Sequence, residues 1–246
     1  MSKAETTGEY FDRTAQVFAA KYRESLNFRE RLAVWQDAVE KVVPGLPDGA
    51  LCLDIGCGDG VFGRMLARRG IRTIGIDQSE AMLAMARAMD LEEGGASPTA
   101  YEASVVPLPP ELERRYAGAA DLIVCSSVLE YIADYEAALM QFFRLLKPQG
   151  VLLLSLPNRQ SLYRAGERGL RGLLSLKDSY LRHQRHQFSF HETGRLLESL
   201  GHKVLDATFF SLPVQAISGR LFPRYRGPWL ATMFLITVEK VGTRPG

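Results

Sequence analysis

The chain has 246 residues, a net charge of +2 and 46% hydrophobic residues. These are ordinary globular values, which exclude a disordered or fibrous chain, and no apolar run approaches the roughly 20 residues that span a bilayer. The first residues, MSKAETTGEYF, lack the apolar core of a secretory signal. Cys52, Cys57 and Cys125 have no metal-binding spacing and indicate reduced thiols. We therefore expect a cytoplasmic protein with one main core.

Strands and helices alternate along most of the chain. The clearest helix covers 79–90, where Ser79 can cap the first turn and the composition favours a helix. Such alternation predicts an α/β fold with a doubly wound, mostly parallel sheet, in which ligands bind at the carboxyl ends of the strands. The expected strands cover 51–55, 72–77, 99–103, 121–126, 151–157, 203–210 and 231–239.

The most informative segment is 51–60, LCLDIGCGDG, an apolar strand that contains Asp54 and breaks into Gly56, Gly58 and Gly60. Glycine lets the backbone turn sharply and approach a ligand, and the helix expected directly afterwards adds free N–H groups. The pattern predicts a nucleotide-type site. The third glycine comes one residue too early for a dinucleotide fingerprint, and no Gly-Lys-Ser/Thr of a P-loop follows. The acid within the motif favours a cation or a hydroxyl-rich ligand over a diphosphate.

Residues 54–60, DIGCGDG, resemble motif I of the class I S-adenosylmethionine (SAM) methyltransferases, commonly (D/E)-x-G-x-G-x-G. Three later segments resemble the family's other motifs in order and spacing: 72–83 (RTIGIDQSEAML), 121–132 (DLIVCSSVLEYI) and 144–158 (RLLKPQGVLLLSLPN). The resemblance implies SAM as the cofactor. It also implies a seven-stranded sheet of order 3-2-1-4-5-7-6 whose last strand is antiparallel.

The resemblance further implies how the chain is organised. Residues 1–44 would form an N-terminal helical cap, and 45–246 would form the SAM-binding methyltransferase domain. Residues 159–190 would be a lid for the methyl acceptor, inserted between the fifth and sixth strands. In the cap, Arg29 or Arg31 would correspond to an arginine that contacts SAM in small-molecule methyltransferases.

The resemblance assigns cofactor contacts to individual residues. Asp54 would hold the ammonium of the methionine part, and Asp77, at the end of the second strand, would accept the ribose hydroxyls. Gln78 would flank the adenine. Many relatives carry an acid after the third strand, where this chain has Ser104, so backbone groups or Glu102 would replace that contact. The expected cofactor-binding residues are Asp54, Gly56, Gly58, Gly60, Asp77, Gln78, Ser104, Val105 and Ser126.

Methyl transfer depends mainly on aligning the acceptor with the sulfonium, and an oxygen acceptor also needs a base. Relatives often show L-E-H after the fourth strand, whereas this chain has LEY at 129–131, so Tyr131 would position the acceptor. His186 best matches a histidine of the family and is the expected base, with a surface role as the alternative. His186→Ala would then lower methyl transfer at least about tenfold without changing SAM affinity. The expected acceptor-pocket residues are Tyr10, Tyr22, Tyr131 and His183.

Sequence features also bear on partners. The chain lacks the (N/D/S)-P-P-(Y/F) run and the Pro-Cys dipeptide of nucleic-acid methyltransferases, and it does not match the acids of metal-dependent catechol enzymes. Neither nucleic acid nor a metal is therefore expected. Residues 1–150 hold 16 Lys or Arg against 22 Asp or Glu, whereas 151–226 hold 12 against 5. The basic, leucine-containing run 159–186 is typical of a lid that contacts a membrane surface, an acidic acceptor or a partner, or of a solvated lid helix.

Three functions are compatible with these features. The leading one is a SAM-dependent O-methyltransferase of a small acceptor that is lipidic or anionic. The alternatives are an N- or C-methyltransferase of a metabolite or macromolecule, and a non-catalytic SAM-binding module. Beyond the cofactor motifs, the chain loosely resembles the ubiquinone-biosynthesis-type O-methyltransferases. It differs from them because it lacks the histidine of the L-E-H motif.

Overall fold

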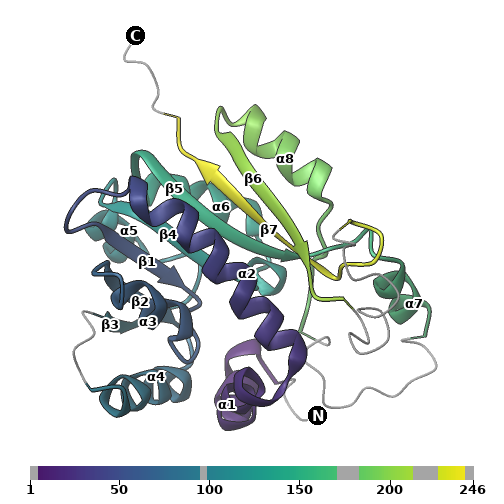
Figure 1. Ribbon diagram of the computed structural model, residues 1–246, viewed down its shortest axis with the longest axis horizontal. Coiled ribbons are helices and arrows are strands. Elements are labelled where there is room, and N and C mark those ends of the chain that lie inside the picture. The colour runs from purple at the N-terminus through teal and green to yellow at the C-terminus, as the bar shows by residue number, and fades with distance from the viewer. Residues whose placement is uncertain (1–4, 95–98, 171–182, 213–226, 242–246) are drawn as a thin grey trace.

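The computed structural model describes residues 5–94, 99–170, 183–212 and 227–241. Its centre is a seven-stranded sheet of order β3-β2-β1-β4-β5-β7-β6 (Figure 1). Neighbouring strands from β3 to β5 pair in parallel, and β7 is antiparallel to both β5 and β6. The expected strand order and antiparallel last strand are confirmed. The strands are β1 (Leu51–Ile55), β2 (Arg72–Asp77), β3 (Thr99–Ala103), β4 (Ala120–Ser126), β5 (Leu146–Pro157), β6 (Lys203–Phe210) and β7 (Met233–Glu239).

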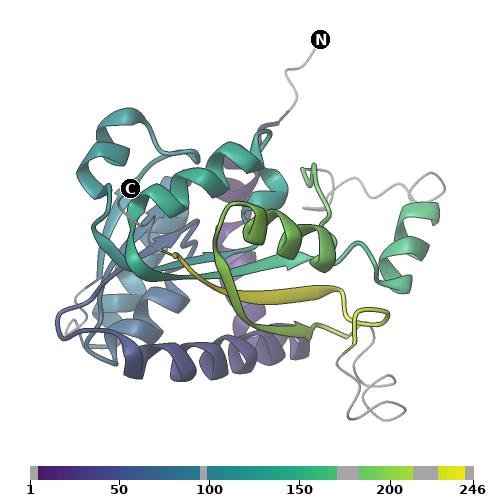
Figure 2. The same ribbon diagram turned by 90° about the horizontal axis from the view of Figure 1, so that it is seen from above.

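Helices cover both faces of the sheet (Figure 2). One face packs on α2 and α3 through a core in which the Trp35 and Phe62 rings lie 4.6 Å apart. The other packs on α5, α6 and α8 through a core that includes Phe142 and Leu197. The described helices are α1 (Thr7–Glu24), α2 (Leu26–Val42), α3 (Val61–Ala67), α4 (Glu80–Glu92), α5 (Pro110–Tyr116), α6 (Tyr135–Leu145), α7 (Leu162–Leu170) and α8 (Phe190–Ser199), with short 3-10 helices η1 (Val43–Gly45) and η2 (Leu129–Tyr131).

Local sequence explains most of the element boundaries. Every residue of β1 is buried, as expected for a central parallel strand covered on both faces. Ser79 caps α4, since its Oγ accepts a hydrogen bond from Met82 N at 3.2 Å. The helix after the glycine loop ends at Ala67, before the tight turn at Gly70 (φ +77°). Three strands start away from their expected positions: β4 at Ala120, β5 at Leu146 and β7 at Met233. The difference is largest for β5, where a register shift lets Leu146 pair with Ala120 at the start of β4.

The N-terminal residues form two helices in different places. The helix α2 runs along the sheet, whereas α1 lies beside α4 near the carboxyl ends of the strands (Figure 1). Asp12 of α1 accepts hydrogen bonds from Ser79 Oγ at 2.5 Å and Ala81 N at 3.3 Å. These bonds tie α1 to the start of α4. Within the described residues, no helix combines the length and hydropathy needed to cross a bilayer.

Candidate functional site

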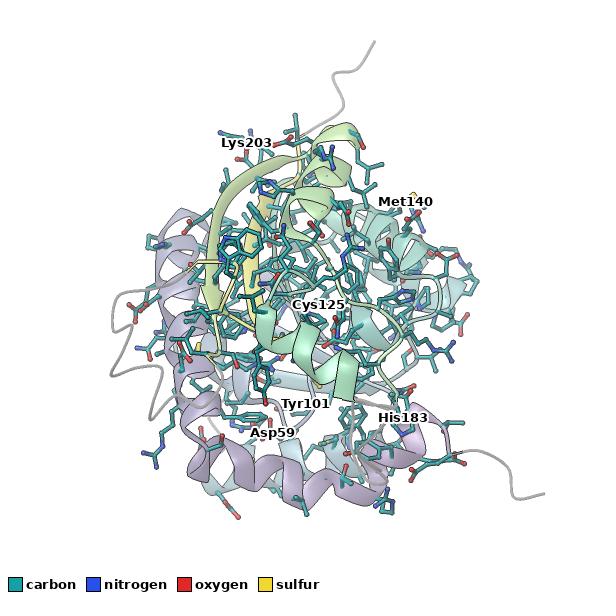
Figure 3. All side chains as sticks on the ribbon, turned by 90° about the vertical axis from the view of Figure 1, so that its right-hand side faces the viewer. Asp59, Tyr101, Cys125, Met140, His183 and Lys203 are labelled. Atoms are coloured by element: carbon teal, nitrogen blue, oxygen red, sulfur yellow. The ribbon has the colours of Figure 1, made fainter. Side chains whose placement is uncertain are left out.

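A cavity of about 240 Å³ lies at the carboxyl ends of the central strands. Its lining follows the order of the sheet, from Asp77 at the end of β2, through the glycine loop after β1, to Ser126 at the end of β4. Arg164 of α7, beyond β5, and Met233 at the start of β7 line the other end. Figure 3 looks onto this region from the side of α7, with Asp59 of the glycine loop and His183 labelled beneath that helix.

The glycine loop is held against the neighbouring strand. Gly56 N donates to Ile76 O at 2.7 Å, and Gly56 has a φ of +71°. A Cβ at this position would lie 2.1 Å from Val128 Cγ2, so only glycine fits. Gly58 (φ +53°) has open space around the same position. Both line the cavity, whereas Gly60 begins α3 outside it.

Asp77 lines the cavity and orders the loop. Its Oδ2 accepts a hydrogen bond from Gly58 N at 2.9 Å, and its Oδ1 accepts one from Ser79 N at 2.9 Å. Burial raises the pKa of this carboxyl, and the backbone N–H groups of Ser79 and Gly58 partly oppose that rise. Each oxygen keeps a lone pair that a ligand hydroxyl can use. Gln78 and Ser104 line the same end of the cavity.

Asp54 lies beneath the loop, outside the cavity lining. Its Oδ2 accepts a hydrogen bond from Gly63 N at 3.1 Å near the start of α3, and its buried Oδ1 has no hydrogen-bond partner. Burial raises the pKa of this carboxyl to about 7, although the Gly63 bond opposes the shift. The acid therefore supports the loop and α3, and its contact with an ammonium stays a prediction.

An acid and two arginines line the middle and far parts of the cavity. Glu130 is only 3% exposed, and its Oε2 has no hydrogen-bond partner in the part of the chain that the structure describes. Burial raises the pKa of its carboxyl to about 7, against the attraction of Arg31 and Arg164. Arg31 donates to Ser126 Oγ and, at 2.9 Å, to Ser127 Oγ, while its buried Nε has no acceptor. A buried donor and a buried acceptor thus stand unsatisfied at a cavity wall, which is typical of a ligand site.

His186 is not among the residues that line this cavity. Its Nε2 lies 3.3 Å from Ala133 O, and its ring packs 4.9 Å from the Tyr135 ring. The backbone of the same segment does reach the site, because Arg185 N and His186 N donate to Glu130 O at 2.7 and 3.1 Å. The backbone at His186 is therefore close to the cavity, whereas its imidazole ring points away from the cavity.

The other expected residues divide between the cavity and its surroundings. Tyr131 lines it, whereas Tyr10 and His183 lie outside the lining, with their rings tilted and 4.9 Å apart. Val105 is 56% exposed and also lies outside. The Tyr22 side chain falls outside the described residues.

Glu130 and Arg164 line the cavity without having been expected there. Glu130 carried a signal, since it follows a buried strand inside the segment that resembles the family's L-E-H motif. Arg164 carried none, because one arginine in a basic run cannot be told from its neighbours before α7 is placed.

Comparison with known proteins identifies the family. A methyltransferase domain model matches residues 27–207. The chain therefore belongs to the SAM-dependent methyltransferases of class I, whose sheet order and glycine loop it shares.

Curated relatives match over part of their length. A ubiquinone biosynthesis O-methyltransferase of Pseudomonas aeruginosa (strain UCBPP-PA14) is 36% identical over 111 residues, which are 45% of this chain and 46% of that protein. One from Leptothrix cholodnii is 33% identical over 121 residues, 49% of each chain. The chain thus matches about half the length of these relatives.

Solved structures share the fold at low identity. Magnesium protoporphyrin IX methyltransferase (ChlM) of Synechocystis PCC 6803, solved with S-adenosylhomocysteine (SAH), has a TM-score of 0.70 and 17% identity over 95% of this chain and 97% of its own. Phosphoethanolamine N-methyltransferase 2 of Haemonchus contortus, solved with SAM, has a TM-score of 0.65 and 15% identity over 97% and 61%. Such identities support the fold and leave the acceptor open.

The cavity fits SAM, the cofactor of the family. The open space beside Gly58 suits the methionine part, and Asp77 offers oxygens to ribose hydroxyls. Arg31 Nε, a buried donor with no acceptor among the described residues, suits a carboxylate. Among the described residues, no group of three His, Cys, Asp or Glu side chains could hold a metal ion.

Proposed function

We propose that this methyltransferase moves the methyl group of SAM to an oxygen of a small-molecule acceptor. The observation that carries the proposal is the extent of the cavity, which continues past the glycine loop to Arg164 and Met233. The lining therefore reaches beyond the residues assigned to the cofactor, and the acceptor would bind at that far end. Phe11 of α1 and Arg31 of α2 line the same cavity, which suits a small molecule better than a macromolecule. The partial match to O-methyltransferases supports oxygen as the receiving atom.

The residues would act mainly by positioning. Asp77 would hold the ribose, and Arg31 would hold the carboxylate of the methionine part. Bound SAM supplies an electrophilic methyl group, so the remaining task is to align the acceptor with it. Tyr131 and Phe11, whose rings meet edge to face at 5.7 Å, form an aromatic wall against which a flat acceptor can pack.

Turnover with matched acceptors tests this function. We expect radiolabel from methyl-labelled SAM to enter 3,4-dihydroxybenzoate and not 3,4-diaminobenzoate, because the two differ only in the receiving atom. Label in the diamine alone would instead support the N-methyltransferase alternative. SAH binding without transfer to any hydroxyl or amine would support a non-catalytic module. His186→Ala in the same assay tests the expected base, and unchanged turnover would remove that role.

The acceptor lid is also proposed to touch membranes. Leu162 and Trp229 are 61% and 58% exposed and adjacent, since Leu162 N donates to Trp229 O at 2.9 Å. Tyr163 is 44% exposed beside them. Exposed aromatic and aliphatic side chains in a basic region suit an anionic bilayer surface. Much of the basic run, 171–182, lies outside the described residues.

Vesicle sedimentation tests the membrane contact. We expect the chain to bind phosphatidylglycerol vesicles at low salt and Leu162→Ser/Trp229→Ser to bind at least about fivefold less, since two interfacial side chains are lost. Leu91→Ser on α4 is the matched control, because Leu91 is 76% exposed on a different helix. Equal binding by both variants, or indifference to anionic lipid, would contradict the proposal.

A further inference from the structure

We propose that Glu130 receives the proton that the acceptor hydroxyl loses when it is methylated. The inference rests on the proposed transfer to oxygen, and it assigns the base to a residue other than His186. Three features of the structure carry it: an unsatisfied carboxylate oxygen, a position in the part of the cavity left to the acceptor, and an electrostatic setting that suits proton transfer.

The carboxylate is buried, fixed in place and in need of a donor. Glu130 is 3% exposed, and its Oε2 has no hydrogen-bond partner although it belongs to a cavity-lining residue. The backbone is held by Arg185 N and His186 N, which both donate to Glu130 O. An acid that is rigidly placed with a vacant acceptor atom suits a ligand that brings an O–H group.

The order of the strands places Glu130 on the acceptor side. The ribose acid Asp77 follows β2, and the glycine loop follows β1. Glu130 follows β4, on the side of β1 away from β2, and Arg164 lies further along after β5. If Asp77 and the glycine loop hold SAM, Glu130 would lie on the side of the cofactor that faces Arg164.

The charges around Glu130 set when it is ionised. Its pKa is raised to about 7 by burial, so the carboxylate form that can take a proton accumulates as the pH rises through neutrality. Arg31 of α2 and Arg164 of α7 favour that form. A hydrogen bond from the Ser127 side chain favours it as well. Burial and the charge of Glu130 raise the pKa of the Cys125 thiol. The other titratable side chains of the lining are Cys57, Asp59, Asp77 and Tyr131, and Asp54 lies outside it.

This setting favours a weakly acidic hydroxyl. Proton transfer from a phenol of pKa about 10 to a carboxylate near 7 is unfavourable by about 10³-fold before methylation. From an alcohol with a pKa near 16, close to that of water, the same transfer is unfavourable by about 10⁹-fold. Glu130 can thus assist a phenol-like acceptor far more than an aliphatic alcohol, and Arg164 would stabilise the developing phenolate.

The step balances as a displacement with proton loss. The acceptor O–H bond breaks and its proton moves to Glu130 Oε2, while a lone pair on the acceptor oxygen forms the bond to the methyl carbon. The carbon–sulfur bond breaks, and its electron pair stays on sulfur to give neutral SAH. Glu130 then returns the proton to solvent, so no oxidant or further reactant is needed.

Calorimetry on the SAH complex tests the assignment without methyl transfer. The probe is 4-methylcatechol, which is neutral near pH 7, titrated in phosphate and in Tris to count protons exchanged with solvent. Its O–H group should select the carboxylate form of Glu130. We expect about half a proton to be released at pH 7, and affinity to rise about tenfold from pH 6 to pH 8. Glu130→Gln should abolish both effects, and His186→Gln should retain both.

Turnover gives the second readout. With 4-methylcatechol as acceptor, Glu130→Gln should lower kcat at pH 7 at least about 100-fold and remove the rise of activity through neutrality. At a pH where the phenol itself ionises, the variant should recover. Its unchanged SAH affinity and thermal unfolding would show that the fold and the cofactor site are intact.

Three results would overturn the assignment. The first is equal proton release by the wild type and by Glu130→Gln. The second is no binding of 4-methylcatechol to the wild-type SAH complex. The third is weaker SAH binding by Glu130→Gln while its binding of 4-methylcatechol is unchanged. The last would place Glu130 at the methionine ammonium. The proposed function is judged separately, since transfer to 3,4-diaminobenzoate alone would overturn it whatever the calorimetry shows.

Discussion

Gly56→Ala is expected to destabilise the fold by about 2–4 kcal/mol and to abolish measurable SAH binding. An alanine at φ +71° costs about 1 kcal/mol, because the left-handed region crowds a Cβ. The added methyl would also lie 2.1 Å from Val128 Cγ2, and forcing such a contact costs about 1–3 kcal/mol more. Val128 lines the cavity, so any shift that relieves the clash also deforms the cofactor site.

Urea unfolding and SAH calorimetry measure the two effects. Gly58→Ala is the matched control for stability, because its φ is +53° but nothing lies within 4 Å of its Cβ position, so it should cost only about 1 kcal/mol. Val128→Ala in the Gly56→Ala background should restore part of the lost stability, giving a clear coupling in a double-mutant cycle. Equal losses at the two glycines, or strictly additive effects of the Gly56 and Val128 changes, would contradict the steric explanation.

The fold and the cofactor half of the site could be read from the sequence because both depend on short-range patterns. A strand such as β1 is buried on both faces and therefore appears as a continuous apolar run. The turn at Gly56 requires a residue without a Cβ, so a glycine in the sequence directly indicates where the turn lies. Asp77 ends a strand beside that loop, and its distance along the chain predicts its place at the same edge of the sheet.

The acceptor half could not be read in this way because its residues come from separate elements. Glu130 and Arg164 lie on η2 and α7 and line one cavity only in the folded chain. Its position relative to a histidine of the family predicts His186 as the base, and its chain segment does reach Glu130. Its ring packs against Tyr135 and so points away from the cavity. The spacing of residues in the sequence does not predict such a side-chain orientation.

Asp77→Asn is expected to weaken SAH binding about 100-fold while preserving the volume of the side chain. Both oxygens of Asp77 accept backbone hydrogen bonds, from Gly58 N and Ser79 N, each at 2.9 Å. An amide replaces one acceptor with an NH₂ donor, which would then face a backbone N–H, so the loop must rearrange. The ribose also loses a charged acceptor. Losing a hydrogen bond to a charged group costs about 1.5–3 kcal/mol, which corresponds to roughly 10- to 100-fold in affinity. Rearrangement of the glycine loop in the variant would weaken binding further.

Calorimetry with SAH and thermal unfolding separate binding from stability in this variant. Glu80→Gln, the same acid-to-amide change at an exposed position on the first turn of α4, is the matched control and should bind SAH like the wild type. Asp77→Glu should bind weakly as well, because a longer side chain cannot keep both short bonds to Gly58 and Ser79. Wild-type affinity in Asp77→Asn would mean that the ribose is held by other groups and that Asp77 serves the loop alone.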